Sequence, residues 1–416
     1  MNAAVLALLA LVVTLVLSMT TRVNVGLVAI GLAWVIGVYV AKLKAETLIA
    51  GFPSTLFITL TGVTLLFAVA KANGTLELLA RRAARLVRGR AGLLPILFFA
   101  FAFVLSAVGP GAIASVALVA PLAMPTGARA RVPNLLTAIM VGTGANAGNL
   151  SPISTAGAMV ATMMSRIRLG GNEWRIFAAM FVAHVVVALA AYLLFGGLRL
   201  LRERTVTGVT NASEPLRRGH WLTIAVTVLW IVAVIGFRAH VGLAAFAAAA
   251  MLIVLRLADE RDTIRGIPLD VILMVCGVSM LIALLESTGG LELFTRLLAR
   301  LATPMTLTGV IAFVTGLIST YSSTIGVVLP TFVPMTPLLV RQVGGGDPVA
   351  VAVAITVGAS LVDVSPLSTL GALCVAAVPE REASRRLFGQ LMVWGLAMSV
   401  VGALFCQAFA GVFARL

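Results

Sequence analysis

The chain has 416 residues, of which 61% are hydrophobic and only 11% are charged. A soluble globular protein carries about 25% charged residues, so this composition excludes a soluble domain and indicates an integral membrane protein. The net charge of +15 would suit a nucleic-acid-binding protein, but the basic residues lie in short loops between apolar runs, where they orient a membrane protein. The expected partner is therefore the lipid bilayer and not nucleic acid.

The apolar runs are about 20 residues long, which predicts membrane-crossing helices rather than the strands of a β-barrel. Basic and apolar residues alternate at helical spacing over residues 75–90, a pattern typical of a helix lying in the membrane interface. An all-α polytopic protein is expected. In chain order its first half has helices at 4–19, 24–40 and 51–70, the interfacial segment, a hairpin at 93–125, a broken helix at 133–168 and a helix at 176–195.

The hairpin is predicted from Gly109-Pro110-Gly111, which interrupts an apolar run halfway. Backbone at membrane depth leaves a helix only where protein or a cavity surrounds it. The Gly-Pro-Gly turn therefore favours a re-entrant hairpin that enters and leaves on one side. Two ordinary short helices are the alternative.

The broken helix contains a polar stretch, GNLSPISTAG, at residues 148–157. A near copy, VDVSPLSTLG, recurs at residues 362–371, and the Ser, Pro, Ser, Thr and Gly of the two stretches coincide at one constant offset. Two such breaks at matching places in two halves are typical of the binding site of a transporter.

The second half repeats the order of the first, which predicts an internal duplication. The expected units are a first repeat at 1–198, a cytoplasmic linker at 199–219 and a second repeat at 220–416, with its own hairpin at 309–337 and broken helix at 348–377. Ordered matches support this division, among them Pro53 with Pro268, Gly62 with Gly277, Glu77 with Glu292, and Arg81 with Arg296.

The number of crossings in each repeat predicts how the repeats are related. Each has about five crossings, because a re-entrant hairpin adds none. An odd number makes the second repeat insert upside down, giving two inverted repeats. This topology places two thirds of the 30 Lys and Arg residues on one side, which should face the cytoplasm. Both termini are then expected outside, in a bacterial-type inner (plasma) membrane.

Hydroxyl groups gather at the second hairpin tip, where Ser319 precedes Ser322-Ser323-Thr324. Hydroxyl and freed carbonyl oxygens are the hard ligands that a small cation such as Na⁺ needs. Helix N-termini beyond each break offer N–H groups and the positive end of a dipole to an anion. Together these elements suit an anionic substrate carried with a cation. Hydrogen bonding between helices is the alternative role for the hydroxyls.

Asp363 is the one acidic residue expected deep in the membrane, where a carboxylate is functional by default and needs a partner. It could bind Na⁺ while ionised, or it could carry a proton; the first role is favoured. Its counterpart in the first half is Asn149, which is neutral, so the paired sites are not chemically equal.

Enzyme signatures are not found: the sequence has no Walker loop, no HExxH and no plausible Ser-His-Asp set. Cys276, Cys374 and Cys406 lie far apart in apolar surroundings and are interpreted as buried thiols. Neither catalysis nor an organic cofactor is expected, and transport would have to run on gradients or on partner proteins.

The order of hairpins and broken helices, with Ser322-Ser323-Thr324 before the sequence VVLP at 327–330, resembles the divalent anion/sodium symporters of the ion transporter superfamily. In that family a Ser-Asn-Thr triplet marks each hairpin tip. The GNLSPIS break is more similar still to the MatC-type malonate and dicarboxylate carriers. The resemblance covers nearly the whole chain, and it implies an elevator-type, Na⁺-coupled carrier of small dicarboxylates, usually a homodimer.

The family's second triplet corresponds to Ser322, Ser323 and Thr324, with Ser323 in place of Asn. The first tip departs from the pattern, because Gly109-Pro110-Gly111 can offer only backbone groups.

The breaks and the resemblance together predict a symporter site for malonate or a C4 acid. The expected substrate contacts are Gly109, Gly111, Ser151, Pro152, Ser154, Thr155, Ser322, Ser323, Thr324, Ser365, Pro366, Ser368 and Thr369. The expected Na⁺ ligands are Ser319, Ser323, Gly358 and Asp363 at one site and Ser106, Asn146 and Asn149 at a second. The alternatives are a cation/proton antiporter on the same scaffold, with Asp363 as the carrier group, and the membrane subunit of a binding-protein-dependent carboxylate transporter.

Overall fold

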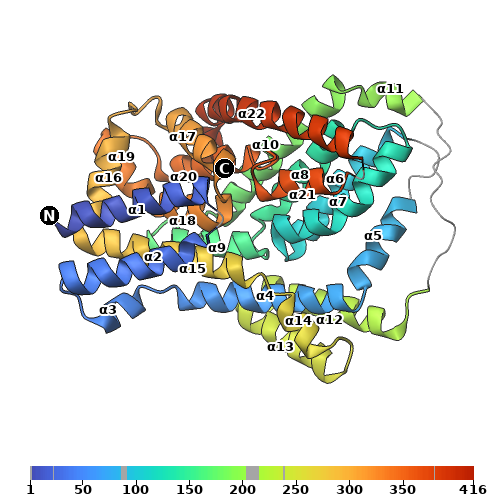
Figure 1. Cartoon of the computed structure of the whole chain (residues 1–416), viewed down its shortest axis with the longest axis horizontal. Coiled ribbons are helices and arrows are strands. Elements are labelled where there is room, and N and C mark those ends of the chain that lie inside the picture. Colours follow the sequence, from blue (N-terminus) through green and yellow to red (C-terminus); the bar gives the residue numbers. More distant parts are fainter. Residues whose placement is uncertain (1, 22, 86–90, 203–214, 238, 379) are drawn as a thin grey trace.

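The computed structural model describes residues 2–21, 23–85, 91–202, 215–237, 239–378 and 380–416, and all regular secondary structure in this part of the chain is helical. By length and composition, five of its helices can cross a bilayer, and the pair Ile272–Thr288 and Gly290–Ala299, bent by 92°, makes a sixth possible crossing. Shorter apolar helices accompany them. The expected all-α, multi-pass membrane protein is confirmed, and Figure 1 shows it as an elongated bundle.

The first half begins with two apolar helices and a short helix that the sequence did not predict. The helix expected at 24–40 continues past Trp34 as a π-helical segment. The helix expected at 51–70 begins only after Pro53, because proline lacks the N–H group that a helix interior needs. The bounds are α1 (Ala3–Thr20), α2 (Val25–Trp34), η1 (Val35–Val40), α3 (Ala45–Ala50), α4 (Ser54–Ala72) and α5 (Thr75–Arg85).

The interfacial segment expected at 75–90 corresponds to α5, and its residues 86–90 lie outside the described part of the chain. The hairpin expected at 93–125 consists of two helices joined at Gly109 and Pro110, of which the second is long enough to cross a bilayer by itself. The helices that follow are α6 (Leu93–Val108), α7 (Gly111–Arg129), α8 (Asn134–Asn149), α9 (Thr155–Arg166), α10 (Glu173–Leu194) and α11 (Gly197–Arg202). Of the expected linker, residues 203–214 are not described.

The second half has the same order of elements. Its hairpin returns in several short pieces, which begin at or just before prolines 330, 334 and 337. The bounds are α12 (Arg218–Phe237), α13 (Val241–Val254), α14 (Glu260–Arg265), α15 (Leu269–Thr288), α16 (Gly290–Ala299), α17 (Leu307–Tyr321), η2 (Thr324–Val328), α18 (Leu329–Phe332), η3 (Val333–Met335), α19 (Thr336–Val343), α20 (Pro348–Leu361), α21 (Thr369–Ala376) and α22 (Arg381–Arg415).

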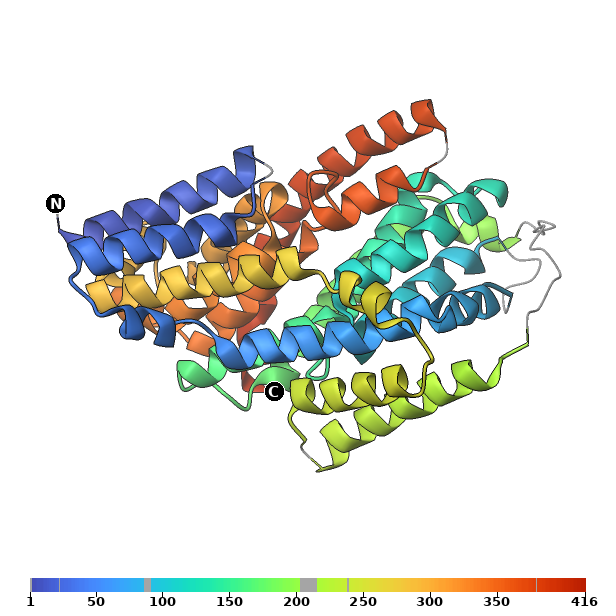
Figure 2. The same cartoon turned by 60° about the horizontal axis from the view of Figure 1, so that its bottom comes forward.

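Two helix pairs join the halves by close backbone contact. α2 packs against α15, and α4 packs against α13, as Figure 2 shows for the second pair. A Cβ atom at Gly26 would lie 2.2 Å from the carbonyl oxygen of Leu273, and one at Gly62 would lie 2.3 Å from that of Gly242. Glycine at these positions lets the backbones touch, as small residues do between membrane helices. We call α2, α4, α13 and α15 the scaffold.

α8 and α20 run through the centre of the rest of the bundle. Every residue at 135–149 and at 349–361 is buried, as expected for helices that are apolar or small on all sides. α6, α7 and α10 pack against α8, while α17 and α22 pack against α20. Gly144, Gly148 and Gly358 allow close approaches, to the backbones of Phe99, Phe103 and Ala312. We call these helices, with α9 and α21, the core; it carries both hairpin tips and both breaks.

Candidate functional site

The first hairpin tip is joined to the first break through backbone groups of the tip. Oδ1 of Asn149 accepts a hydrogen bond from the N–H of Ala112 at 3.0 Å, and the N–H of Thr155 donates to the carbonyl of Gly109 at 3.0 Å. At Gly111 φ is +78°, and a Cβ atom there would lie 2.8 Å from Oγ1 of Thr155. Glycine is therefore required at this position both by conformation and by space.

Ser154 fixes the shape of the first break. As the N-cap residue of α9 it accepts a hydrogen bond from the N–H of Gly157 at 2.9 Å. Its Oγ also lies 2.5 Å from the carbonyl oxygen of Asn149 and 2.8 Å from that of Ser151, to which it can donate its one hydrogen. Such a cap satisfies one of the N–H groups left free at a helix start. The hydroxyl is thus occupied by its own segment.

The second junction is built around a carboxylate instead. Asp363 is 5% exposed, and its Oδ1 accepts hydrogen bonds from Oγ1 of Thr324 and, at 3.3 Å, from Oγ of Ser368. Oγ of Ser319 is in turn hydrogen-bonded to Thr324. Ser368 is the N-cap residue of α21, yet its side chain makes no capping hydrogen bond and reaches Asp363. A buried carboxyl group thus gathers three hydroxyl groups from the second tip and the second break.

The two halves meet where α8 and α20 cross. Nδ2 of Asn146 donates to the carbonyl of Ser360 at 2.9 Å, and these two residues occupy matching positions of the two repeated segments. Oδ1 of Asn146 and the hydroxyl of Ser360 are buried without a hydrogen-bond partner among the described residues, as is the hydroxyl of Ser106 on α6. Unpaired polar atoms are uncommon in protein interiors and point to a ligand or a water molecule.

A small cavity of about 20 Å³ lies beside Asp363. It is lined from the first tip by Ala112 and Ile113, from the second tip by residues 323–325, and from the second break by Asp363 and residues 368–370. This volume is close to that of one water molecule or small cation, for which roughly 10–15 Å³ suffices. Three of the four expected elements therefore line one small space.

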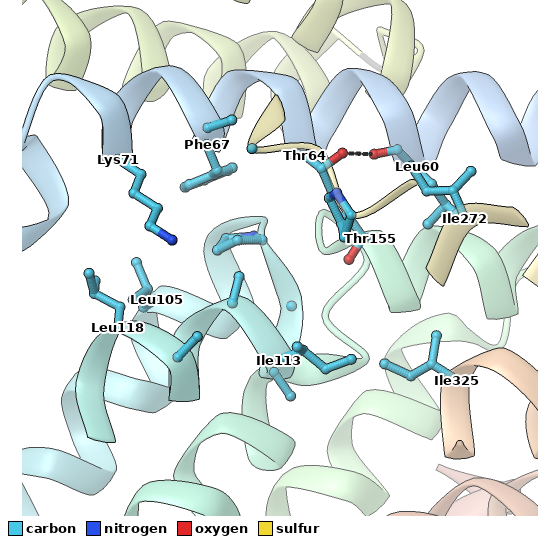
Figure 3. A pocket seen from close by; sticks show the side chains of 18 of the residues that line it. Leu60, Thr64, Phe67, Lys71, Leu105, Ile113, Leu118, Thr155, Ile272 and Ile325 are labelled. Atoms are coloured by element: carbon cyan, nitrogen blue, oxygen red, sulfur yellow. Dashed lines mark hydrogen bonds between the residues drawn. The ribbon is translucent and has the colours of Figure 1, made fainter. Parts of the chain in front are cut away.

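A larger cavity of about 230 Å³ separates the scaffold from the first tip (Figure 3). Leu60, Phe67 and Lys71 of α4 line one side, and residues 110–114 of the first hairpin line the other. Thr155 of the first break also lines it, so the fourth expected element opens onto this second space. The lining is mostly apolar.

The structure places the predicted substrate contacts at the four junction segments. Gly109 and Gly111 form the first tip, Ser322, Ser323 and Thr324 the second, and the remaining residues lie in the breaks or at the first position of the following helix. Ser151, Ser154, Thr155, Ser322, Thr324, Ser365, Pro366 and Ser368 are buried, Pro152 and Ser323 are half-buried, and Thr369 is exposed.

The predicted cation ligands divide by what they contact. Ser319 and Asp363 belong to the hydroxyl-carboxylate cluster, whereas Ser323 caps its own segment, because its Oγ accepts from the N–H of Gly326 at 3.0 Å. Gly358 packs against the backbone of Ala312. Of the second predicted set, Ser106 and Asn146 keep unpaired oxygens, and Asn149 holds the first tip.

Three residues around these cavities were not expected from the sequence. Ile113 and Ile325, one from each hairpin tip, line both cavities, and Lys71 lines the larger one. A signal for Lys71 was present, since it is a cation in the last turn of an otherwise apolar helix. Nothing in the sequence distinguished the two isoleucines, because apolar residues are common throughout the chain.

These features define a class: a multi-pass helical membrane protein with a buried carboxyl group beside two hairpin tips and one broken helix. Comparison with known proteins adds the family context. Residues 1–149 match the family model described as the dicarboxylate carrier protein MatC N-terminus. The resemblance to MatC-type carriers is thereby confirmed over just over a third of the chain.

Two solved transporters share the fold at low sequence identity. The crystal structure of the YdaH transporter of Alcanivorax borkumensis matches with a TM-score of 0.57 and 17% identity, covering 89% of each chain. MtrF of Neisseria gonorrhoeae, described as illuminating a class of antimetabolite efflux pumps, matches with a TM-score of 0.53 and 14% identity, covering 98% of this chain and 94% of MtrF. No curated protein matches in sequence.

Proposed function

We propose that the protein is a secondary active transporter that imports a small dicarboxylate, malonate or a C4 acid, together with Na⁺. The observation that carries this proposal is the carboxylate of Asp363, buried beside a cavity of ion size and hydrogen-bonded to hydroxyls of Thr324 and Ser368. A buried charge without a cation is costly, and oxygen ligands are those that hard cations prefer. Na⁺ at this position would neutralise the charge.

The anionic half of the cargo is inferred from different features. The family model that matches residues 1–149 is that of a dicarboxylate carrier. The N-terminus of α7 forms the first tip and that of α9 follows the first break, so the positive ends of two helix dipoles lie at the first junction. A substrate carboxylate there would also lie near the bound Na⁺. The positive charge of the ion would lower the free-energy cost of burying the carboxylate.

For the movement itself we propose two inverted repeats and an elevator mechanism, in which the core slides along the scaffold. The repeated element order and the reciprocal pairs α2 with α15 and α4 with α13 support this arrangement, since each half supplies one member of each pair. The glycine contacts of these pairs would make the scaffold rigid. The cavity between α4 and the first tip would let the core move past the scaffold.

A cation/proton exchanger is the second candidate. Asp363 is the acidic side chain of the cluster, and it accepts hydrogen bonds from the neutral hydroxyls of Thr324 and Ser368. A carboxylate in such a setting could bind either a proton or Na⁺, so that the same residue would exchange one ion for the other. This function would require no organic anion.

Thermal unfolding of the purified protein tests the two candidates. Melting temperature is measured in NaCl or choline chloride at equal ionic strength, each with malonate, succinate or citrate. Mass action stabilises the folded state by about 2.7 kcal/mol when a ligand is present at about 100 times its Kd. We expect malonate or succinate to raise the melting temperature in NaCl and not in choline chloride.

The other outcomes are equally informative. A rise caused by Na⁺ alone, unchanged by every acid, would contradict the symporter and support the exchanger. A rise caused by an acid in choline chloride as well would remove Na⁺ coupling from the proposal.

A further inference from the structure

The larger cavity has one charged side chain in an otherwise apolar wall. Among the described residues that line it, Lys71 alone carries a charge. Figure 3 shows the side chain of Lys71 extending from α4 toward the first hairpin, between Phe67 above and Leu105 and Leu118 below. Apolar walls of low polarisability strengthen the field of a charge within a cleft. Lys71 is itself exposed, and its amino group brings a positive charge to a space that is large enough for a small organic anion.

The second half of the chain has no lysine at the position that corresponds to Lys71. The alignment that pairs Pro53 with Pro268 pairs Lys71 with Glu286, so the second half carries the opposite charge at this place. Glu286 lines neither of the two cavities described here. A positive charge is thus present only on the member of this pair that faces a cavity.

The cavity of Lys71 adjoins the cavity of Asp363. Ala112, Ile113 and Ile325 line both spaces, so that the walls between them are the two hairpin tips. Figure 3 shows Ile113 and Ile325 next to each other at the floor of the larger cavity. An anion beside Lys71 would be separated from the carboxylate cluster by two isoleucine side chains, which can change rotamer.

We propose that Lys71 forms a carboxylate-binding site, in which one carboxylate of the transported acid pairs with its amino group on the way to or from the hairpin tips. The carbon chain of the acid would then contact Leu60, Phe67 and Ile272 of the apolar wall, and Thr155 offers a hydroxyl further along the same cavity. The assignment rests on the proposed transport of a carboxylate, and it adds a substrate-binding residue from the scaffold.

The composition of the chain allows a direct test by chemical labelling. The sequence contains three lysines, Lys42, Lys44 and Lys71, and the first two lie between η1 and α3, away from both cavities. Purified full-length protein in NaCl is acetylated with an amine-reactive ester, and the rate at each lysine is followed by peptide mass spectrometry. With succinate at about ten times its Kd, mass action should slow acetylation of Lys71 about tenfold. Lys42 and Lys44 should react at unchanged rates, and uncharged succinamide should protect none of the three.

Three variants complete the test. Lys71→Met keeps the length of the side chain without its charge and should raise the Kd for succinate about tenfold, whereas Lys71→Arg should bind nearly as the unmodified protein does. Lys44→Met removes one positive charge from a surface loop and should leave Kd unchanged. Equal melting temperatures without ligand would show that all three variants fold.

The outcomes separate this inference from the proposed function. Na⁺-driven succinate uptake without protection of Lys71, or equal protection of all three lysines, would overturn the inference alone. Protection of Lys71 without any Na⁺-driven uptake would keep the anion site and overturn the symporter. Absence of both protection and uptake would overturn both.

Discussion

The two junctions between hairpin tip and broken helix have the same plan and different chemistry. In the first, the amide of Asn149 accepts a hydrogen bond from the backbone of the tip, and Ser154 is occupied as a helix cap. In the second, Asp363 takes the position of the amide, and Ser368, which corresponds to Ser154, donates to that carboxylate instead of capping. One substitution between repeats thus redirects the hydrogen bonds around it.

Under the proposed function the two junctions have different roles, one structural and one in cation binding. At the first tip, Oδ1 of Asn149 accepts from the N–H of Ala112 and the N–H of Thr155 donates to the carbonyl of Gly109, so these bonds hold the hairpin in place. At the second, hydroxyl groups of Thr324 and Ser368 bond to the carboxyl group of Asp363, where the proposed Na⁺ would complete the site. Under the proposed function the duplicated geometry would be used twice, once to fix a loop and once to bind a cation.

The largest effect is expected from removing the charge of the second junction. Asp363→Asn keeps the shape of the side chain but should lower Na⁺ affinity about a hundredfold, equivalent to about 3 kcal/mol, and abolish Na⁺-driven uptake in proteoliposomes. Asp347→Asn is the control, because Asp347 caps α20 from an exposed position and asparagine caps equally well. Full Na⁺ dependence in Asp363→Asn would show that the two junctions do not differ in function.

A second test addresses the geometry that the junctions share. A Cβ atom at Gly157 would lie 1.8 Å from the carbonyl oxygen of Ser151, and one at Gly371 would lie 2.1 Å from that of Ser365. Alanine at either glycine should destabilise the fold by about 3 kcal/mol, because backbone must move. Melting temperature without ligand measures the loss, with Gly411→Ala as the control, since nothing lies within 4 Å of its added methyl group. A lower melting temperature for only one of the two alanine variants would mean that the breaks are not equivalent in structure.

The structural role of the first junction predicts a smaller loss. Asn149→Ala leaves the N–H of Ala112 without its partner and should lower the free energy of unfolding by about 2 kcal/mol. The dependence of the melting temperature on Na⁺ should persist in this variant. Asn134→Ala, at the opposite end of α8, serves as the control. If Asn149→Ala removed the response to Na⁺ while the fold stayed stable, the first junction would also be a cation site.

The smallest effects should distinguish the two matching serines. Ser154→Ala removes a helix cap and should lower stability by about 1 kcal/mol with little change in Na⁺ affinity. Ser368→Ala removes a donor to Asp363 and should change Na⁺ affinity severalfold with little loss of stability. Each variant is the control for the other, and melting temperature with and without Na⁺ measures both. Identical responses would remove the distinction between the junctions.

Much of this arrangement could be predicted from the sequence, because the signals were local. The Gly-Pro-Gly turn and the two SPxST stretches stand where the structure interrupts its helices, at residues 109–110, 150–154 and 362–368. α3 and the π-helical segments η1 and η2 were not predicted, since a change of helix type leaves the apolar pattern almost unaltered.

The hydrogen-bond partners at the site could not be predicted as well from the sequence, because they depend on contacts between segments that are distant along the chain. Ser154 and Ser368 stand in nearly the same local sequence and point to different partners, and only the residues brought beside them decide which. The orientation of Lys71 depends likewise on the cavity between α4 and the first hairpin, which no stretch of sequence contains. The second predicted cation set, Ser106, Asn146 and Asn149, stays a prediction.

The close glycine contacts of the scaffold also constrain how the protein is made. Gly26 on α2 meets α15, and Gly62 on α4 meets α13, so each early helix packs against one that is synthesised some 200 residues later. Until then its small-residue face is covered only by lipid, which offers no comparable backbone contact. The scaffold is therefore completed late in biogenesis. α2 and α4 can pack against their partner helices only after the second half of the chain has been synthesised and inserted.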